Sequence, residues 1–174
     1  MEVTDLINRI VQNYKLSPQL RPTIYAQFAG KPITSWPIHV FSGSGREKAQ
    51  TLFNLGREVA RRPENAGKEL LESVLVTEIW GAAAGPVRPI SLPESKREEA
   101  VMLLKVVNQL PFKTHADYYS ILRKSGKVAE LVFKDASDEV EGLLAQSFTA
   151  GCRSLAVSDE QLKRLPFDPR PFLR

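Results

Sequence analysis

Four segments with the pattern of β-strands follow one another in the middle of the chain, with no helix between them. Residues 70–80 form the first and residues 99–110 the second, while residues 114–134 have the pattern of a hairpin that turns at Ser125-Gly126. Successive strands can pair antiparallel, whereas parallel strands need a crossover element between them. This run therefore favours an antiparallel sheet and argues against a doubly wound parallel fold.

Helical periodicity and turn residues place the other elements around this run. Helices are predicted over residues 4–15, 44–62 and 137–151 and from Ser158 onward, and short strands over residues 21–30 and 35–41. The sequence thus predicts a single α+β domain over residues 1–174, with a largely antiparallel sheet of about five to six strands and helices packed mainly on one face. Residues 166–174 are expected to form an extended C-terminal tail.

Two of the strands carry information about their place in the sheet. Residues 99–110 are almost continuously apolar, which favours a central strand buried on both faces and leaves a helix as the alternative. Residues 35–41 contain Pro37, which has no backbone N–H and so cannot donate a hydrogen bond in a central strand. We therefore expect this second segment either to lie at an edge of the sheet or to begin after the proline.

The composition narrows the class of protein. The chain has 174 residues, 43% of them hydrophobic and 25% charged, which suits a globular domain and not a disordered tail. Its only cysteine, Cys152, cannot form an intramolecular disulfide and is expected to be a small buried or half-buried residue. The sequence shows neither a signal-peptide pattern nor a membrane-spanning stretch, which predicts a cytoplasmic protein with no membrane partner.

A glycine-rich turn precedes the helix over residues 44–62. Backbone N–H groups at Gly43 and Gly45 could hold an anion there, although the phosphate-binding patterns are incomplete. Ser44 and Glu47 have the spacing of a capping box, which would satisfy the same N–H groups within the chain. The sequence therefore favours a helix cap and keeps Gly43 and Gly45 as weaker anion-site candidates.

His115 and Asp117 lie two residues apart on a predicted strand, so they share one face and could act together as a general base or as metal ligands. A two-residue turn in the hairpin would place Asp117 opposite Lys134 as a structural ion pair, and a bulged turn would change that register. Because two histidines without a cysteine pair make a poor ligand set, we expect no metal and no cofactor.

The long connection over residues 81–98 joins two predicted strands. Glu78 and Trp80 share a face beside it, Arg88 and Arg97 lie within it or at its end, and its prolines stiffen it. Connections of this length are often functional. The connection is interpreted either as a lid over a ligand site formed by Glu78, Trp80, Arg88 and Arg97, or as a structural flap over the sheet.

The same region carries a sequence pattern, E-x-W followed by R-P and then R-E-E-A. Its residues are Glu78, Trp80, Arg88, Pro89, Pro93, Arg97, Glu98, Glu99 and Ala100. With this pattern the chain resembles small prokaryotic α+β proteins of unassigned function, over about residues 40–135. The resemblance implies no activity.

Three functional hypotheses follow. The leading one is a non-enzymatic binding or assembly protein, in which residues 166–174, with Phe167, Phe172 and Leu173, contact a partner or a second copy. The second is a small hydrolase or transferase that uses Glu78, His115 and Asp117. The third is weak nucleic-acid binding through the basic helix over residues 44–62, which the modest net charge of +4 does not favour.

Overall fold

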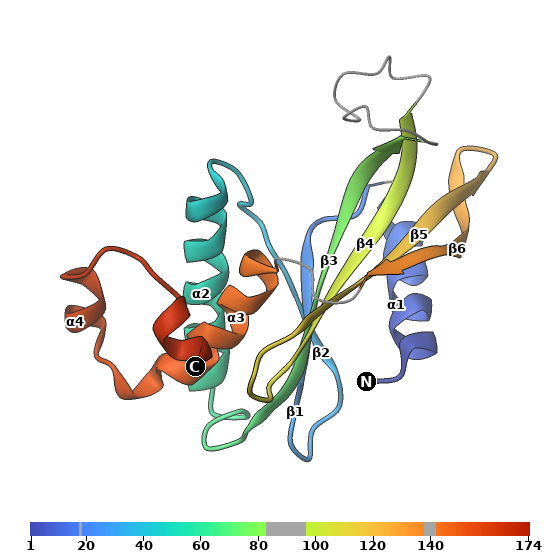
Figure 1. Cartoon of the computed structure of the whole chain (residues 1–174). Helices are drawn as coiled ribbons and strands as arrows, with labels where there is room; N and C mark the ends of the chain where they lie inside the picture. Colours follow the sequence, from blue (N-terminus) through green and yellow to red (C-terminus); the bar gives the residue numbers. More distant parts are fainter. Residues whose placement is uncertain (18, 83–96, 138–141) are drawn as a thin grey trace.

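One antiparallel sheet of six strands forms the centre of the protein (Figure 1). The computed structural model describes residues 1–17, 19–82, 97–137 and 142–174, with the backbone alone at residues 80–82, 97 and 98. The strands are β1 (Thr23–Phe28), β2 (Thr34–Pro37), β3 (Leu70–Ala82), β4 (Arg97–Val107), β5 (Thr114–Lys124) and β6 (Lys127–Ser137), in the spatial order β2-β1-β3-β4-β5-β6. Every neighbouring pair is antiparallel, which confirms the predicted class.

The positions of two strands match their sequence signals. β4 lies between β3 and β5, so the nearly continuous apolar segment is a central strand and not a helix. β2 ends at Pro37 and forms one edge of the sheet. Its outer side needs no ladder hydrogen bonds, which is why the proline is tolerated there.

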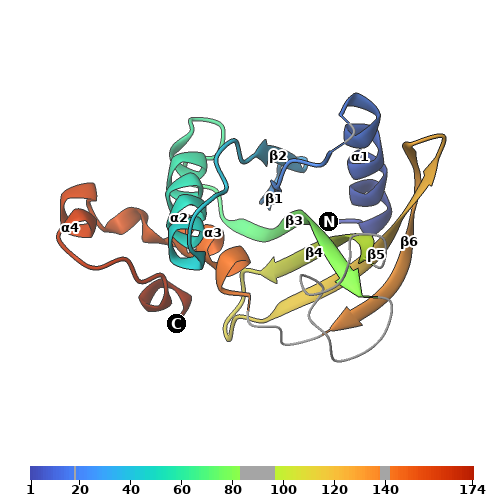
Figure 2. The same cartoon turned by 90° about the horizontal axis from the view of Figure 1, so that it is seen from above.

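Helices cover both faces of the sheet (Figures 1 and 2). On one face, α1 (Val3–Leu16) buries Leu6, Ile10 and Tyr14 in a core cluster that includes Val74 and Val76 of β3. On the other face lie α2 (Gly45–Arg61) and α3 (Leu143–Arg153), in a cluster that includes Leu75. Successive residues of a strand point to opposite faces, so three consecutive apolar residues in β3 require cover on both sides.

α2 and α3 cross at two glycines. A Cβ added to Gly56 of α2 would lie 2.2 Å from the backbone oxygen of Phe148, and a Cβ added to Gly151 of α3 would lie 2.1 Å from the backbone oxygen of Phe53. Each glycine therefore admits the backbone of the opposite helix. Backbone contact fixes the spacing of the two helices, and a side chain at either glycine would force them apart.

Both predicted capping boxes are confirmed. The hydroxyl of Ser44 accepts a hydrogen bond from the Glu47 N–H, and the Glu47 carboxylate accepts one from the Ser44 N–H at 2.6 Å. Ser158 and Gln161 make the equivalent pair at the start of α4 (Asp159–Lys163). The orphan N–H groups before α2 are therefore bound locally, which is the structural role predicted for this turn.

The segment after α3 folds back on the domain. It comprises η3 (Ser154–Ala156), α4 and η4 (Arg170–Leu173), and we call residues 154–174 the C-terminal arm. Figure 1 shows the arm in red beside α2, on the side away from the sheet. Residues 166–174, expected to be an extended tail, include the 3₁₀-helix η4 and pack on their own chain.

The β5–β6 hairpin has the predicted two-residue turn but a different register. Ser125 and Gly126 both have positive φ, 52° and 77°, and Lys124 pairs with Lys127. Two bulges then shift the pairing, so that Asp117 lies opposite Ala136 and not opposite Lys134 as expected. A bulge adds one unpaired residue to one strand, and the sequence carries no clear signal for its position.

Candidate functional site

A large hollow lies between α2 and the C-terminal arm. Its volume is about 890 Å³, within the range of roughly 300–1,000 Å³ that is typical of small-molecule sites. We call it the arm groove. It is lined by Gln50, Phe53, Asn54, Arg57, Glu58, Arg61, Arg62, Val157, Asp159, Leu162, Lys163, Leu165, Pro166, Phe167, Asp168, Pro171 and Phe172.

The helix α2 supplies one wall of the groove from a single face. Gln50, Phe53, Arg57 and Arg61 follow one another at spacings of three or four residues, so their side chains lie in one row along the helix. The opposite row carries Leu52 and Val59 into the core. The amphipathic sequence of α2 therefore builds the core and the groove wall together.

A buried arginine attaches the arm to α2. The Arg57 side chain is only 4% exposed, so it is buried despite its charge. Its guanidinium donates to the backbone oxygen and hydroxyl of Ser154, to the backbone oxygen of Val157 at 2.7 Å and to the Asp159 carboxylate at 2.9 Å. The partners lie about 100 residues away in sequence, which is why helical periodicity alone could not place Arg57.

A second arginine shares the same carboxylate. Arg61 donates to both oxygens of Asp159, at 2.9 and 3.1 Å, in the forked geometry typical of arginine and carboxylate. The hydrogen bonds from Arg61 and then Arg57 lower the pKa of Asp159 to about 2. Two guanidinium groups thus face one carboxylate at the wall of the groove.

Aromatic rings and backbone contacts hold the far end of the arm. The Phe53 ring lies 5.5 Å from the Phe167 ring and 5.6 Å from the Phe172 ring, measured between centroids. Arg46 donates to the backbone oxygen of Phe167, and Arg153 donates to that of Phe172. Because the arm is attached at both ends, its middle part arches over the groove.

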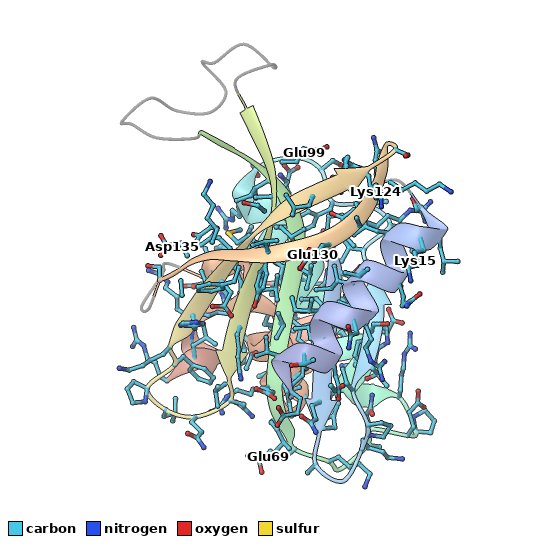
Figure 3. The ribbon with its side chains drawn as sticks, turned by 90° about the vertical axis from the view of Figure 1, so that its right-hand side faces the viewer. Lys15, Glu69, Glu99, Lys124, Glu130 and Asp135 are labelled. Atoms are coloured by element: carbon cyan, nitrogen blue, oxygen red, sulfur yellow. The ribbon has the colours of Figure 1, made fainter. Side chains whose placement is uncertain are left out.

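Glu78, a predicted ligand-binding residue, is bound within the fold. One oxygen of its carboxylate accepts hydrogen bonds from the Tyr14 hydroxyl at 2.7 Å and from the Leu20 N–H at 2.8 Å. Burial and the contact with Glu78 raise the pKa of Tyr14 well above its usual range. Glu78 therefore connects the sheet to the end of α1 and to the segment that follows it (Figure 3 shows this face).

The other predicted residues of that region are only partly described. Arg88 and the connection at residues 83–96 lie outside the described residues, as do the side chains of Trp80 and Arg97. Their backbones are paired, Trp80 with Glu99 and Arg97 with Ala82. Glu99, labelled in Figure 3, accepts two hydrogen bonds from Arg123, so it too has an internal partner.

His115 and Asp117 do come together. The Nε2 atom of His115 lies 2.8 Å from the Asp117 carboxylate, beside a hollow of about 650 Å³ whose lining includes Lys105 and Lys113. The pairing registers place Glu78 level with Tyr119 and two strands away. Two strand spacings amount to about 10 Å, which separates Glu78 from the His115–Asp117 pair beyond hydrogen-bond reach.

The basic side chains of α2 are largely occupied. Arg57 and Arg61 bind Asp159, Arg62 pairs with Glu58, and Lys48 lies over the Phe41 ring. Gly45 is the first residue of α2, and Gly43 has a φ of 90° next to the Glu47 carboxylate. The Glu47 carboxylate therefore occupies the place beside Gly43 where an external anion would bind.

The arm groove is not among the sites predicted from the sequence. Its elements were recognised separately: the amphipathic helix, the capping box at Ser158 and the aromatic tail. A signal was present in the spacing of Phe53, Arg57 and Arg61, which puts one aromatic and two cationic side chains in a row. The sequence did not reveal that the tail would lie on this row.

Metal binding, membrane spans, the single cysteine and known relatives remain to be considered. Within the described ranges, no three His, Cys, Asp or Glu side chains are grouped so as to bind a metal ion. No helix in that part of the chain has the length and hydrophobicity needed to cross a membrane. Burial raises the pKa of the Cys152 thiol, whose sulfur contacts the Gly56 oxygen, so a structural role is supported. Comparison with family models, curated proteins and solved structures finds no match for this chain.

Proposed function

We propose that the protein is a non-enzymatic binding protein that holds an apolar ligand in the arm groove. The observation that carries this proposal is a hollow of about 890 Å³ between α2 and the arm, lined by Phe53, Phe167 and Phe172. Rings of this size contribute most of the binding energy in small-molecule sites, while a few polar groups orient the ligand.

The arrangement of the arm supports a ligand site over a site of assembly. The Phe167 and Phe172 rings contact Phe53 of the same chain, so assembly through residues 166–174 would first have to break these contacts. The enzymatic alternative has weaker support, because Glu78 is bound to Tyr14 and Leu20 and lies away from His115 and Asp117.

A neutral fluorescent probe tests the proposal. N-phenyl-1-naphthylamine brightens in apolar sites, and we expect saturable binding of one molecule per chain. Leu165 lines the groove and is 65% exposed, so Leu165→Trp should narrow the groove without disturbing the core. We expect this variant to weaken probe binding by about tenfold, equivalent to about 1.4 kcal/mol.

Leu16→Trp is the matched control, because Leu16 is an exposed leucine at the end of α1, on the other face of the sheet. It should bind the probe as the original protein does. Circular dichroism should show that both variants remain folded. Equal binding by the two tryptophan variants, or no saturable binding at all, would overturn the proposal.

A further inference from the structure

We infer that the ligand of the arm groove is an amphipathic anion, with a compact apolar body and one carboxylate or sulfonate head group bound beside Arg61 and Lys163. This inference rests on the proposed function and adds the chemical class of the ligand. It follows from the separation of apolar and cationic side chains within the groove.

The apolar part of the groove surrounds the aromatic cluster. The centroids of the Phe167 and Phe172 rings both lie within 5.6 Å of the Phe53 ring centroid. Leu162 and Leu165 belong to the same lining. The Phe53 side chain is 3% exposed and forms the base of this cluster. A hydrocarbon or ring system placed here would remove apolar surface from water at about 25 cal/mol per Å².

The cationic part lies where α2 meets α4. Arg57 and Arg61 share the single carboxylate of Asp159, so one positive charge in this trio remains uncompensated. Arg61 is 45% exposed, whereas Arg57 is buried behind it. Lys163, at the end of α4, is exposed and forms no ion pair with any residue in the described ranges.

The other acidic side chains of the lining do not cancel this excess. Glu58 pairs with Arg62 at 2.9 Å. Asp168 accepts two side-chain hydrogen bonds from Arg170, which lower its pKa to about 2. Each of these acids already has its own cation, and the charge that remains in the groove is positive. An anionic head group is complementary to that charge, and a cationic one is not.

A pair of probes that differ mainly in the head group tests the inference. Anilinonaphthalene-8-sulfonate carries an anionic sulfonate, and N-phenyl-1-naphthylamine has the same ring system without it. We expect the sulfonate to bind about tenfold more tightly at low salt, and this ratio to fall as salt screens the charges. Decanoate should displace both probes, whereas decanol and decylammonium should be weaker competitors.

Charge variants locate the head group. We expect Lys163→Gln to weaken binding of the sulfonate probe about threefold to tenfold and to leave the neutral probe unchanged. Lys124→Gln is the control, because Lys124 is an exposed lysine at the tip of the β5–β6 hairpin, on the α1 side (Figure 3). It should change neither probe. Lys163→Gln keeps the Arg61–Asp159 pair, so its effect reports on charge and not on folding.

The possible outcomes separate the two proposals. If both probes bind equally and Lys163→Gln affects neither, the anionic class is wrong while the binding function stands. Tighter binding of decylammonium than of decanoate would also overturn the anionic class. If neither probe gives saturable binding that Leu165→Trp weakens, the binding function itself fails. Tighter sulfonate binding that depends on Lys163 would support both.

Discussion

On the α1 face of the sheet, one helix is tied to β3 through the side chains of Tyr14 and Glu78, whereas on the opposite face α2 and α3 meet through their backbones at Gly56 and Gly151. The first contact uses polar groups that the sequence makes conspicuous. The second uses positions that carry no side chain. Polar groups with perturbed titration often mark functional sites, but those around Glu78 join secondary-structure elements.

The comparison extends to where space is left open. On the α1 face, the polar side chains have hydrogen-bond partners within the fold. Glu78 accepts from Tyr14 and from the Leu20 N–H, and Glu99 accepts from Arg123. On the other side, the arm bridges away from α2 and leaves a hollow of about 890 Å³. The hollow that we propose as a ligand site therefore lies beside the backbone-packed helices, where the arm is held at its ends.

Disruption of the glycine crossing should have the largest effect. A methyl group at Gly56 would meet the backbone oxygen of Phe148, which cannot move without shifting α3. We expect Gly56→Ala to lower the free energy of unfolding by about 3 kcal/mol, as measured by urea denaturation.

Gly45→Ala provides the control, because a Cβ at Gly45 has no heavy atom within 4 Å and the residue lies in the first turn of the same helix. Alanine there should be neutral or slightly stabilising. Equal losses in the two variants would show that close helix contact is not the cause.

Removal of the buried arginine should weaken the arm more than the sheet. Arg57→Ala leaves the oxygens of Ser154 and Val157 without their donor. We expect a loss of about 2–3 kcal/mol in unfolding free energy together with faster hydrogen exchange in the arm. Exchange that accelerates equally in β3 and β4 would contradict a local role for Arg57.

Truncation of Glu78 should loosen α1 without changing the groove. Glu78→Ala removes the acceptor of Tyr14 and Leu20, and we expect a loss of about 2 kcal/mol in unfolding free energy. Binding of the naphthylamine probe should stay the same. Glu69→Ala, at an exposed glutamate labelled in Figure 3, should change neither quantity. Lost probe binding in Glu78→Ala alone would place Glu78 in the ligand site.

The smallest expected effect is the dependence of the free energy of unfolding on alkaline pH. The pKa of Tyr14 is raised by burial and by Glu78 from an ordinary value of 10.0, so the unfolded chain loses this proton at lower pH than the folded protein does. The stabilisation is fully present below about pH 10 and falls above it, by about 1.4 kcal/mol per pH unit for one proton. Tyr14→Phe should make the decline shallower between about pH 10 and pH 11. An unchanged slope would contradict this assignment.

The fold was predictable where local pattern and tertiary structure agree. The α+β class, the edge strand with Pro37 and the central strand β4 followed from periodicity and proline chemistry. The hairpin register did not, because two bulges shift it, one between Leu122 and Arg123 beside the turn and one between Tyr118 and Tyr119. An apolar β3 requires cover on both faces, but this pattern does not say that α1 covers one face and that α2 and α3 cover the other.

The candidate site was less predictable for a physical reason. Glu78, His115 and Asp117 were conspicuous because charged groups among apolar residues need an explanation, and partners such as Tyr14 supply it. The spacing along α2 does not mark Arg57 as buried, because its partners lie in the arm, far along the chain. A groove formed by two distant segments leaves no spacing to read in either one.

The crossing of α2 and α3 also has a consequence for the proposed ligand preference of the groove. The spacing of these helices depends on backbone atoms and on two glycines, and it does not depend on the exposed residues Gln50 and Asn54 along the groove. Substitutions at those two positions alter the chemistry offered to a ligand while the scaffold keeps its geometry. If the groove binds a ligand as proposed, its preference can therefore be changed at these two positions without loss of the fold.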